Sequence, residues 1–217
     1  MIFRKVMIIL LLLACSGCKD MLRKEPPPPP PTGPQSKEEV LAAVNPIIAP
    51  LRTTISGGPV ISETERYTMM TGLRDAIMQY GSTEFGRQAF RDLAYEVQDI
   101  AKQASAIEKY RLVLICVDVT ELLSVESHLL KRLGQKADVM LDKPKVQVKG
   151  FIDDIEKKQT YIFIEIINHR KGTLERMEAR EGDEFNDLRV VRILGRNQAV
   201  LFEYLKLPGL FFEVEAF

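Results

Sequence analysis

The spacing of apolar residues divides the chain into a helical part and a β-rich part. Between residues 36 and 134, apolar side chains recur every three or four positions, which is the period of a helix packed on one face. Between residues 144 and 217 they occur in short alternating runs separated by turn residues, which is typical of β-strands. We therefore expect an α+β fold, with a helical region at 36–134 followed by a small β-sandwich or partly open β-barrel at 144–217.

Local signals predict where the helices of the first part begin and end. Two capping boxes, Ser36–Glu39 and Ser62–Glu65, mark helix N-termini. Pro46 and Pro50 are expected to limit the first helix to a short piece, because proline interrupts helical hydrogen bonding. The helix that follows Ser62 is expected to end at Gly81, which stands where a left-handed C-terminal glycine belongs.

The rest of the helical part consists of two apolar stretches. A stripe of apolar residues from Phe85 to Ile107 predicts an amphipathic helix of more than 20 residues. The run from 110 to 133 is apolar enough for either a buried helix or a buried strand, and its helical flanks favour helix. Gly134 is expected to end it.

The β-rich part contains six apolar runs, which predict six short strands. In the first run, Val146, Val148 and Ile152 are expected to share one face. A module of this size leaves strand edges open, and an open edge can accept a partner strand through backbone hydrogen bonds.

The N-terminus has the layout of a bacterial export signal. Arg4 and Lys5 precede Val6–Leu13, an unbroken apolar run of eight residues that is too short to span a bilayer as a helix. The sequence that follows, Leu12–Cys15, resembles the lipobox of bacterial lipoproteins.

The lipobox resemblance implies that residues 1–14 are a signal peptide and that a diacylglycerol is attached to Cys15. Cys18 is the alternative lipidation site, although the residue three positions before it is Cys15 rather than an aliphatic one. Two or three acyl chains anchor a protein stably to a membrane. Residues 15–35 would then form a lipid-anchored linker, whose six consecutive prolines at 26–31 predict an extended spacer without a folded core.

Composition excludes several classes of function. The 30 basic residues balance the 30 acidic ones, so the basic surplus that nucleic-acid binding needs is absent. Loss of Arg4 and Lys5 with the signal peptide would leave a net charge of −2, which gives no polybasic attraction to lipid headgroups. Three cysteines and two histidines are too few for a disulfide framework or a zinc site built on His and Cys.

No set of residues forms a recognisable catalytic motif. The best nucleophilic candidate is Cys116, with His128 and Asp118 near it in sequence, but we interpret Cys116 as a packed small hydrophobe. The acidic residues Asp153, Asp154 and Asp183 lack the spacing of a cation-binding loop, and His169 is expected to be a solvated turn residue. We therefore expect no enzymatic activity, no cofactor, no metal and no small-molecule substrate.

The β-rich part contains a succession of motifs that resembles a known family. The motifs are Gly150–Ile152, Tyr161–Ile166, Glu181–Phe185, Leu188–Ile193 and Ala199–Phe202. Together they resemble the periplasmic domain of PilP-type pilus assembly lipoproteins and the related homology region of type II secretion GspC proteins. The resemblance covers about 60 of the 217 residues, and the lipobox and proline-rich spacer also resemble the PilP arrangement.

The resemblance implies a membrane-anchored periplasmic adaptor of a type IV pilus or type II secretion machine. Its β-domain would dock on the periplasmic domain of a secretin, or on inner-membrane components of the machine. The expected partner-binding residues are Val146, Val148, Phe151, Val191 and Ile193.

Two alternatives to this interpretation stay open. About 100 helix-rich residues stand where PilP-type proteins have an extended segment, so the chain could be a structural or assembly lipoprotein that interacts through its helical region. Ser16 after the lipidated cysteine indicates sorting to the outer membrane, whereas the family resemblance implies the inner membrane, which we favour, with the protein facing the periplasm.

Overall fold

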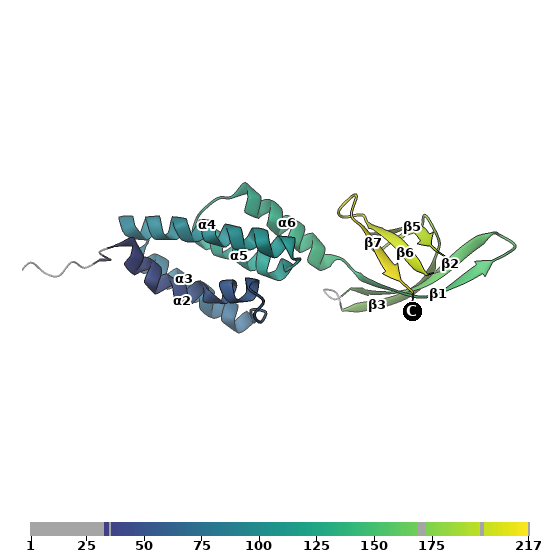
Figure 1. Ribbon diagram of the computed structural model, residues 1–217, viewed down its shortest axis with the longest axis horizontal. Coiled ribbons are helices and arrows are strands. Elements are labelled where there is room, and N and C mark those ends of the chain that lie inside the picture. The colour runs from purple at the N-terminus through teal and green to yellow at the C-terminus, as the bar shows by residue number, and fades with distance from the viewer. Residues whose placement is uncertain (1–32, 35, 169–171, 196–197, 217) are drawn as a thin grey trace, which may run out of the picture.

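A computed structural model of the chain describes residues 33–34, 36–168, 172–195 and 198–216. Within these residues, five helices are followed by seven strands in two antiparallel sheets, which confirms the α+β class. The helical region and the β-domain lie end to end, and the last helix leads directly into the first strand (Figure 1). The predicted signal peptide, Cys15, Cys18 and the proline tract lie outside the described residues.

The helical region packs around one long central helix. The helices are α2 (Lys37–Ile55), α3 (Glu63–Tyr80), α4 (Glu84–Ala106), α5 (Tyr110–Leu122) and α6 (His128–Asp142). Helix α4 contacts the other four and carries the longest buried stripe. The expected amphipathic helix of more than 20 residues is confirmed, since α4 has 23.

Helix α2 is longer than predicted, because it contains both Pro46 and Pro50 and still runs for 19 residues. Its buried face is formed by Val40, Val44 and Ile48, each 1% exposed or less, and by Leu51. Burying four such side chains contributes roughly 1.5–3 kcal/mol each, which offsets two prolines that cost about 3 kcal/mol each. Tertiary packing therefore holds this segment in a helix that its local sequence disfavours.

The capping box at Ser62 is confirmed. The Ser62 hydroxyl accepts a hydrogen bond from the Glu65 amide at 3.2 Å, and the Glu65 carboxylate accepts one from the Ser62 amide at 2.8 Å. At Ser36 the serine half of the predicted capping box is present, because its hydroxyl accepts from the Glu39 amide at 3.2 Å. These serines satisfy amides that the first turn of a helix otherwise leaves without partners.

Replacing Ser62 with alanine is expected to lower the free energy of unfolding of the helical region by about 1 kcal/mol. Hydrogen bonds from Ser62 hold the pKa of Glu65 below its usual value, so the cap stabilises the folded state at neutral pH and loses strength as Glu65 protonates in acid. In urea unfolding, the difference in the free energy of unfolding between the wild type and Ser62→Ala should therefore be larger at pH 7 than below about pH 4. Ser82→Ala is the control, and equal losses from both variants would contradict the prediction.

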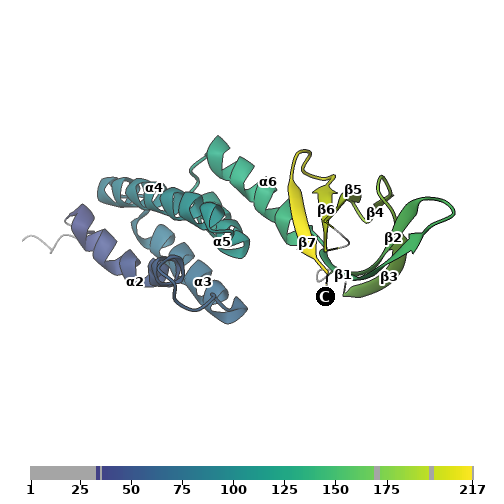
Figure 2. The same ribbon diagram turned by 45° about the vertical axis from the view of Figure 1, so that its right-hand side comes forward.

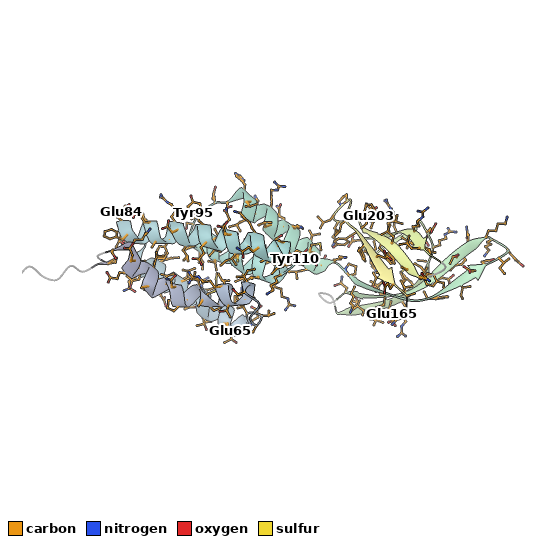
Figure 3. The ribbon with its side chains drawn as sticks, in the orientation of Figure 1. Glu65, Glu84, Tyr95, Tyr110, Glu165 and Glu203 are labelled. Carbon is orange, nitrogen blue, oxygen red and sulfur yellow. The ribbon has the colours of Figure 1, made fainter. Side chains whose placement is uncertain are left out.

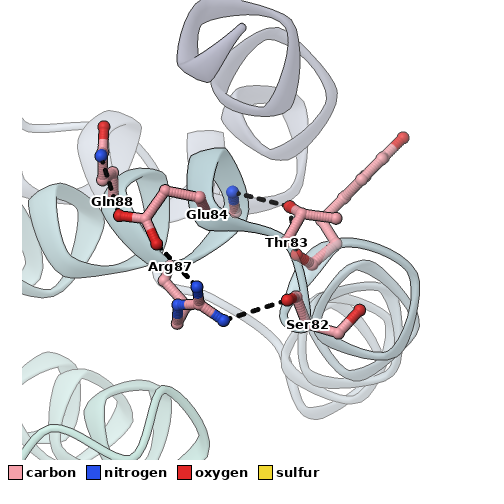
Figure 4. Close-up of polar contacts among 7 residues, drawn as sticks. Ser82, Thr83, Glu84, Arg87 and Gln88 are labelled. Carbon is pink, nitrogen blue, oxygen red and sulfur yellow. Dashed lines mark hydrogen bonds and ion pairs between the residues drawn. The ribbon is translucent and has the colours of Figure 1, made fainter. Parts of the chain in front are cut away.

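The start of α4 needs a glycine at its third residue. Thr83 caps the helix by accepting from the Gly86 amide at 2.9 Å, while Arg87 donates to the Ser82 carbonyl at 3.0 Å and pairs with Glu84 (Figure 4). A Cβ on Gly86 would lie 1.9 Å from a backbone carbonyl oxygen of the preceding helix. The turn between α3 and α4 is thus too tight for any other residue.

One expected helix end is confirmed and the other is wrong. Helix α3 ends at Tyr80 with Gly81 as its C-cap, although Gly81 has the right-handed conformation, with φ −63°, and not the left-handed one. Gly134 lies inside α6, which continues to Asp142, so the helical region extends beyond residue 134. A Cβ on Gly134 would lie 3.1 Å from a methyl of Val117, so this glycine lets α6 approach α5 closely. The run 110–133 accordingly forms two packed helices rather than one.

The β-domain is a partly open barrel built from two sheets around one core. The first sheet has the order β1 (Lys145–Asp154), β2 (Gln159–Asn168), β3 (Thr173–Ala179). The second has the order β4 (Glu184–Phe185), β5 (Leu188–Leu194), β6 (Ala199–Tyr204), β7 (Phe211–Glu215). The six predicted strands are confirmed, and β4 is an additional short one.

The two sheets are joined at both sides of the core. Val148 of β1 forms a parallel bridge with Ala216 after β7. On the other side, the side-chain amide of Asn186 in the β4–β5 turn donates to the Glu175 carboxylate of β3 at 2.8 Å. The sheets therefore curve around a shared core, to which Ile162, Ile164, Val190, Phe202 and Tyr204 contribute.

A β-bulge reverses the expected alternation in β1. Val148 is paired with Ile164, whereas Gly150 is paired with Phe163, so the register shifts between Val148 and Gly150. A bulge inserts one residue and moves the following side chains to the opposite face. Ile152 is consequently on the outside, 54% exposed, and Phe151 packs against the core.

Candidate docking edge of the β-domain

Among the residues that the structure describes, the far half of β1 has no strand paired to its outer edge. Strand β2 is the one strand to which β1 is paired in its sheet, and Val148 forms the parallel bridge to Ala216, the last described residue of the chain. Beyond this bridge β1 continues to Asp154, and the β1–β2 hairpin projects away from β6 and β7 in both views (Figures 1 and 2). We call Gly150–Asp154 the distal edge.

An apolar surface lies beside the distal edge. Ile152 is paired with Tyr161 and Gly150 with Phe163, so the three side chains share the outer face of the sheet. Ile152 and Phe163 are 54% and 36% exposed, and nothing lies within 4 Å of a Cβ placed on Gly150. We call Ile152, Tyr161 and Phe163 the distal face. A partner strand that extends the sheet past Gly150 would bring its own side chains against this face.

Charged residues cover the opposite edge of the same sheet. On β3, Arg176 pairs with Glu165 of β2 at 2.6 Å, and Lys149 approaches the same carboxylate at 3.1 Å. Figure 3 labels Glu165 on this sheet. Hydrogen bonds from Arg176 and Lys149 hold the pKa of Glu165 below its usual value. Glu175 and Glu178 are also exposed on β3. Charges of this kind discourage edge-to-edge pairing. On β1, Lys149 precedes the distal edge and Asp153 and Asp154 end it, so the uncharged part of this edge is Gly150–Ile152.

The residues predicted to bind a partner do not form one surface. Val146 and Val148 are 6% and 0% exposed in the β-domain core, so their side chains are not available to a partner. Phe151 also packs on this core, while Val191 and Ile193 lie on β5 in the other sheet. We therefore revise the predicted contact residues on β1 from Val146, Val148 and Phe151 to the distal face.

Strict alternation along β1 places Ile152 on the core face, so the sequence pattern did not predict the distal face. Only Gly150, a glycine inside a strand pattern, could have indicated a bulge and hence an inverted face after it.

The candidate nucleophilic residues do not converge. Cys116 is fully buried, and burial raises the pKa of its thiol to about 12. Asp118 forms an ion pair with Arg66 at 2.6 Å, and His128 lines a groove between α5 and α6. Within the described part of the chain, no hydrogen bond joins any two of Cys116, Asp118 and His128. A protonated thiol closed off from solvent is a poor nucleophile.

The three aspartates considered as a cation site form local hydrogen bonds in turns or between paired strands. Asp153 accepts from the Thr160 hydroxyl at 2.7 Å, Asp154 from the Lys157 amide at 3.0 Å, and Asp183 from the Arg180 amide at 3.0 Å. Across residues 33–216, leaving aside those not described, no cluster of three or more His, Cys, Asp or Glu side chains could hold a metal ion. His169 lies outside the described residues.

The helical region offers a second candidate surface, which is a groove. A groove of about 710 Å³ lies between α5 and α6 and is lined by Leu114, Val117, Val125 and Leu130. Glu121, Glu126 and Lys131 also line it. The groove mixes both signs of charge, so it does not favour a partner of one charge over another.

Comparisons with protein-family models, with curated proteins and with solved structures give no match for this chain. Among the described helices, none combines the length and the apolar character needed to cross a bilayer.

Proposed function

We propose that the protein is a membrane-anchored periplasmic adaptor whose distal edge binds an extended segment of an envelope partner, such as the periplasmic domain of a secretin. The observation that carries the proposal is an uncharged strand edge, Gly150–Ile152, next to an exposed apolar face. The lipobox at Leu12–Cys15 and the resemblance of the strand motifs to PilP-type and GspC-type domains support the anchored location and the class of partner.

Binding in this proposal involves no chemical step. The backbone of β1 beyond Val148 would supply hydrogen bonds to the partner strand, and Ile152 and Phe163 would supply apolar contact area. A lipid anchor and a spacer hold the β-domain near partners in the same membrane system, which raises the effective concentration of the docking edge. A weak interaction at the distal edge would therefore suffice for a high occupancy.

Direct binding measurements test this function. The full lipidated chain, purified in detergent, is expected to bind the isolated N-terminal periplasmic domains of a secretin with micromolar affinity in calorimetry. Chemical-shift changes in the β-domain should be largest at Gly150–Asp154. Absence of binding at millimolar concentration would contradict the secretin partner, and a mature protein recovered from cells without lipid would contradict the anchored adaptor.

The groove between α5 and α6 favours a second candidate, a structural or assembly lipoprotein that interacts through its helical region. Val125 lines this groove and is half-buried, so Val125→Glu places a charge in it without replacing a core residue. Partner binding that is lost in Val125→Glu and kept in Ile152→Glu would favour the helical region over the distal edge.

A further inference from the structure

The boundary between the helical region and the β-domain lies within α6 and not in a loop. The first part of α6 belongs to the helical core, where Leu130 and Ala137 are 3% and 0% exposed. Val139, in the same helix, packs instead against the core of the β-domain. One continuous helix thus takes part in both hydrophobic cores.

The exposed end of α6 is capped by the β-domain. The amide of Lys143 bonds to the Met140 carbonyl, so the Val139 carbonyl lacks the partner that a continuing helix would give it. The hydroxyl of Tyr204 donates to this carbonyl at 3.1 Å. Tyr204 is fully buried at the end of β6, so the contact is part of the β-domain core.

A lysine of the β6–β7 turn forms ion pairs that join the β-domain to the end of α6. Lys206 lies 2.5 Å from the Asp142 carboxylate, at the last residue of α6, and 3.2 Å from that of Asp187 in the β4–β5 turn. The two carboxylates raise the pKa of Lys206, so the lysine keeps its charge throughout the physiological range. A cation here also interacts favourably with the C-terminal end of the helix dipole.

A third contact involves the short connection to β1. The ammonium group of Lys143 lies 3.5 Å from the centroid of the Phe212 ring in β7. Burial lowers the pKa of Lys143, and the negative charge of Glu108 in the α4–α5 turn opposes this shift. The side chain of Lys143 is therefore also attracted by a charge of the helical region. Cation–π contacts of this kind are stronger where water is partly excluded.

We infer that these three contacts form a junction lock that makes the helical region and the β-domain move as one rigid body. The lock consists of Tyr204, Lys206 and Phe212 on the β-domain against Val139, Asp142 and Lys143 at the end of α6. Without it, Lys143 and Pro144 would be a two-residue hinge between α6 and β1. The lock fixes the direction in which the β1–β2 hairpin projects from the helices. It does not depend on which partner the distal edge binds.

The experiment measures distances between the two parts of the full chain in detergent by electron paramagnetic resonance. Spin labels on non-natural amino acids are placed at two exposed positions, Arg91 in α4 and Glu178 in β3, so the native cysteines stay unchanged. The double variant Tyr204→Phe/Lys206→Met removes the hydroxyl and the charge while keeping the ring and most of the aliphatic stem.

The wild type is expected to give one narrow distance distribution, and the double variant one at least twice as wide. The matched control is Tyr161→Phe/Lys157→Met, which removes a hydroxyl bonded to Gln159 and an ion pair with Asp154, both far along the β1–β2 hairpin. It should remain as narrow as the wild type. If the double variant folds poorly, the single variant Lys206→Met replaces it in the measurement, because the side chain of Lys206 is partly exposed.

A broad distribution in the wild type would overturn the inference. So would a junction variant that folds, by circular dichroism, and gives a distribution as narrow as that of the control. No partner is present in this measurement, so its failure would leave the docking proposal untouched.

Discussion

Replacing Phe202 with alanine is expected to unfold the β-domain while the helices of the amino-terminal part remain folded. Phe202 is fully buried, and its ring stacks on that of Phe212 with centroids 5.7 Å apart. Truncating a buried phenylalanine costs about 3–5 kcal/mol, from lost burial and from the cavity that remains. A domain of this size has a total stability of only about 3–5 kcal/mol, so the variant would lose most of it.

The separate unfolding follows from the presence of two cores. The buried residues that form the helical core and those that form the β-domain core are different sets. Hydrogen exchange followed by mass spectrometry should therefore show full exposure of β2, β5 and β6 in Phe202→Ala, with the amides of α4 still protected. Phe211→Ala, at a neighbouring side chain that is 50% exposed, is the control and should change neither region.

Two outcomes would contradict this prediction. If Phe202→Ala unfolds no more readily than Phe211→Ala, then Phe202 does not carry the β-domain core. If α4 loses protection together with the strands, then the two cores are one cooperative unit. The second outcome would mean that the contacts at the end of α6 contribute to folding as well as to rigidity.

Local signals in the sequence were sufficient to predict the order and the type of most helices and strands. Ser36 and Ser62 stand at the N-termini of α2 and α3, as their capping patterns predicted, and all six predicted strands are present. The failures have a common physical origin. Pro46 and Pro50 lie inside a helix because burial against α4 outweighs their local cost, and Gly134 lies inside α6 because α5 packs close to it. Contacts between distant residues decided both cases.

The candidate site was less predictable than the fold. The sequence indicated β1 as a docking strand, but the bulge before Gly150 exchanged the inner and outer side chains of its far half. A register shift of this kind depends on how β1 and β2 twist against each other, which a single strand pattern does not encode. The contacts of Tyr204 and Lys206 with α6 join residues more than 60 positions apart, and no local pattern predicts them.

The substitution Ile152→Glu is expected to weaken binding of the secretin domains at least tenfold without destabilising the protein. Ile152 is 54% exposed, so its replacement leaves the core intact. A charge at this position would have to be desolvated against the partner strand, and charged side chains are the usual means by which proteins prevent edge pairing. The few residues at the centre of an interface that dominate binding cost about 2 kcal/mol or more when removed, and a tenfold loss of affinity corresponds to about 1.4 kcal/mol.

Leu174→Glu provides the matched control for this prediction. Leu174 is 55% exposed on the outer face of the same sheet, but it lies on β3 opposite Ile167, whereas Ile152 is opposite Tyr161. These two partners are six positions apart on β2, which corresponds to about 20 Å along the strand. Calorimetry should give a wild-type affinity for Leu174→Glu and a reduced one for Ile152→Glu, with equal melting temperatures. Equal loss in both variants would indicate a general charge effect, and unchanged binding in both would place the docking surface outside the distal edge.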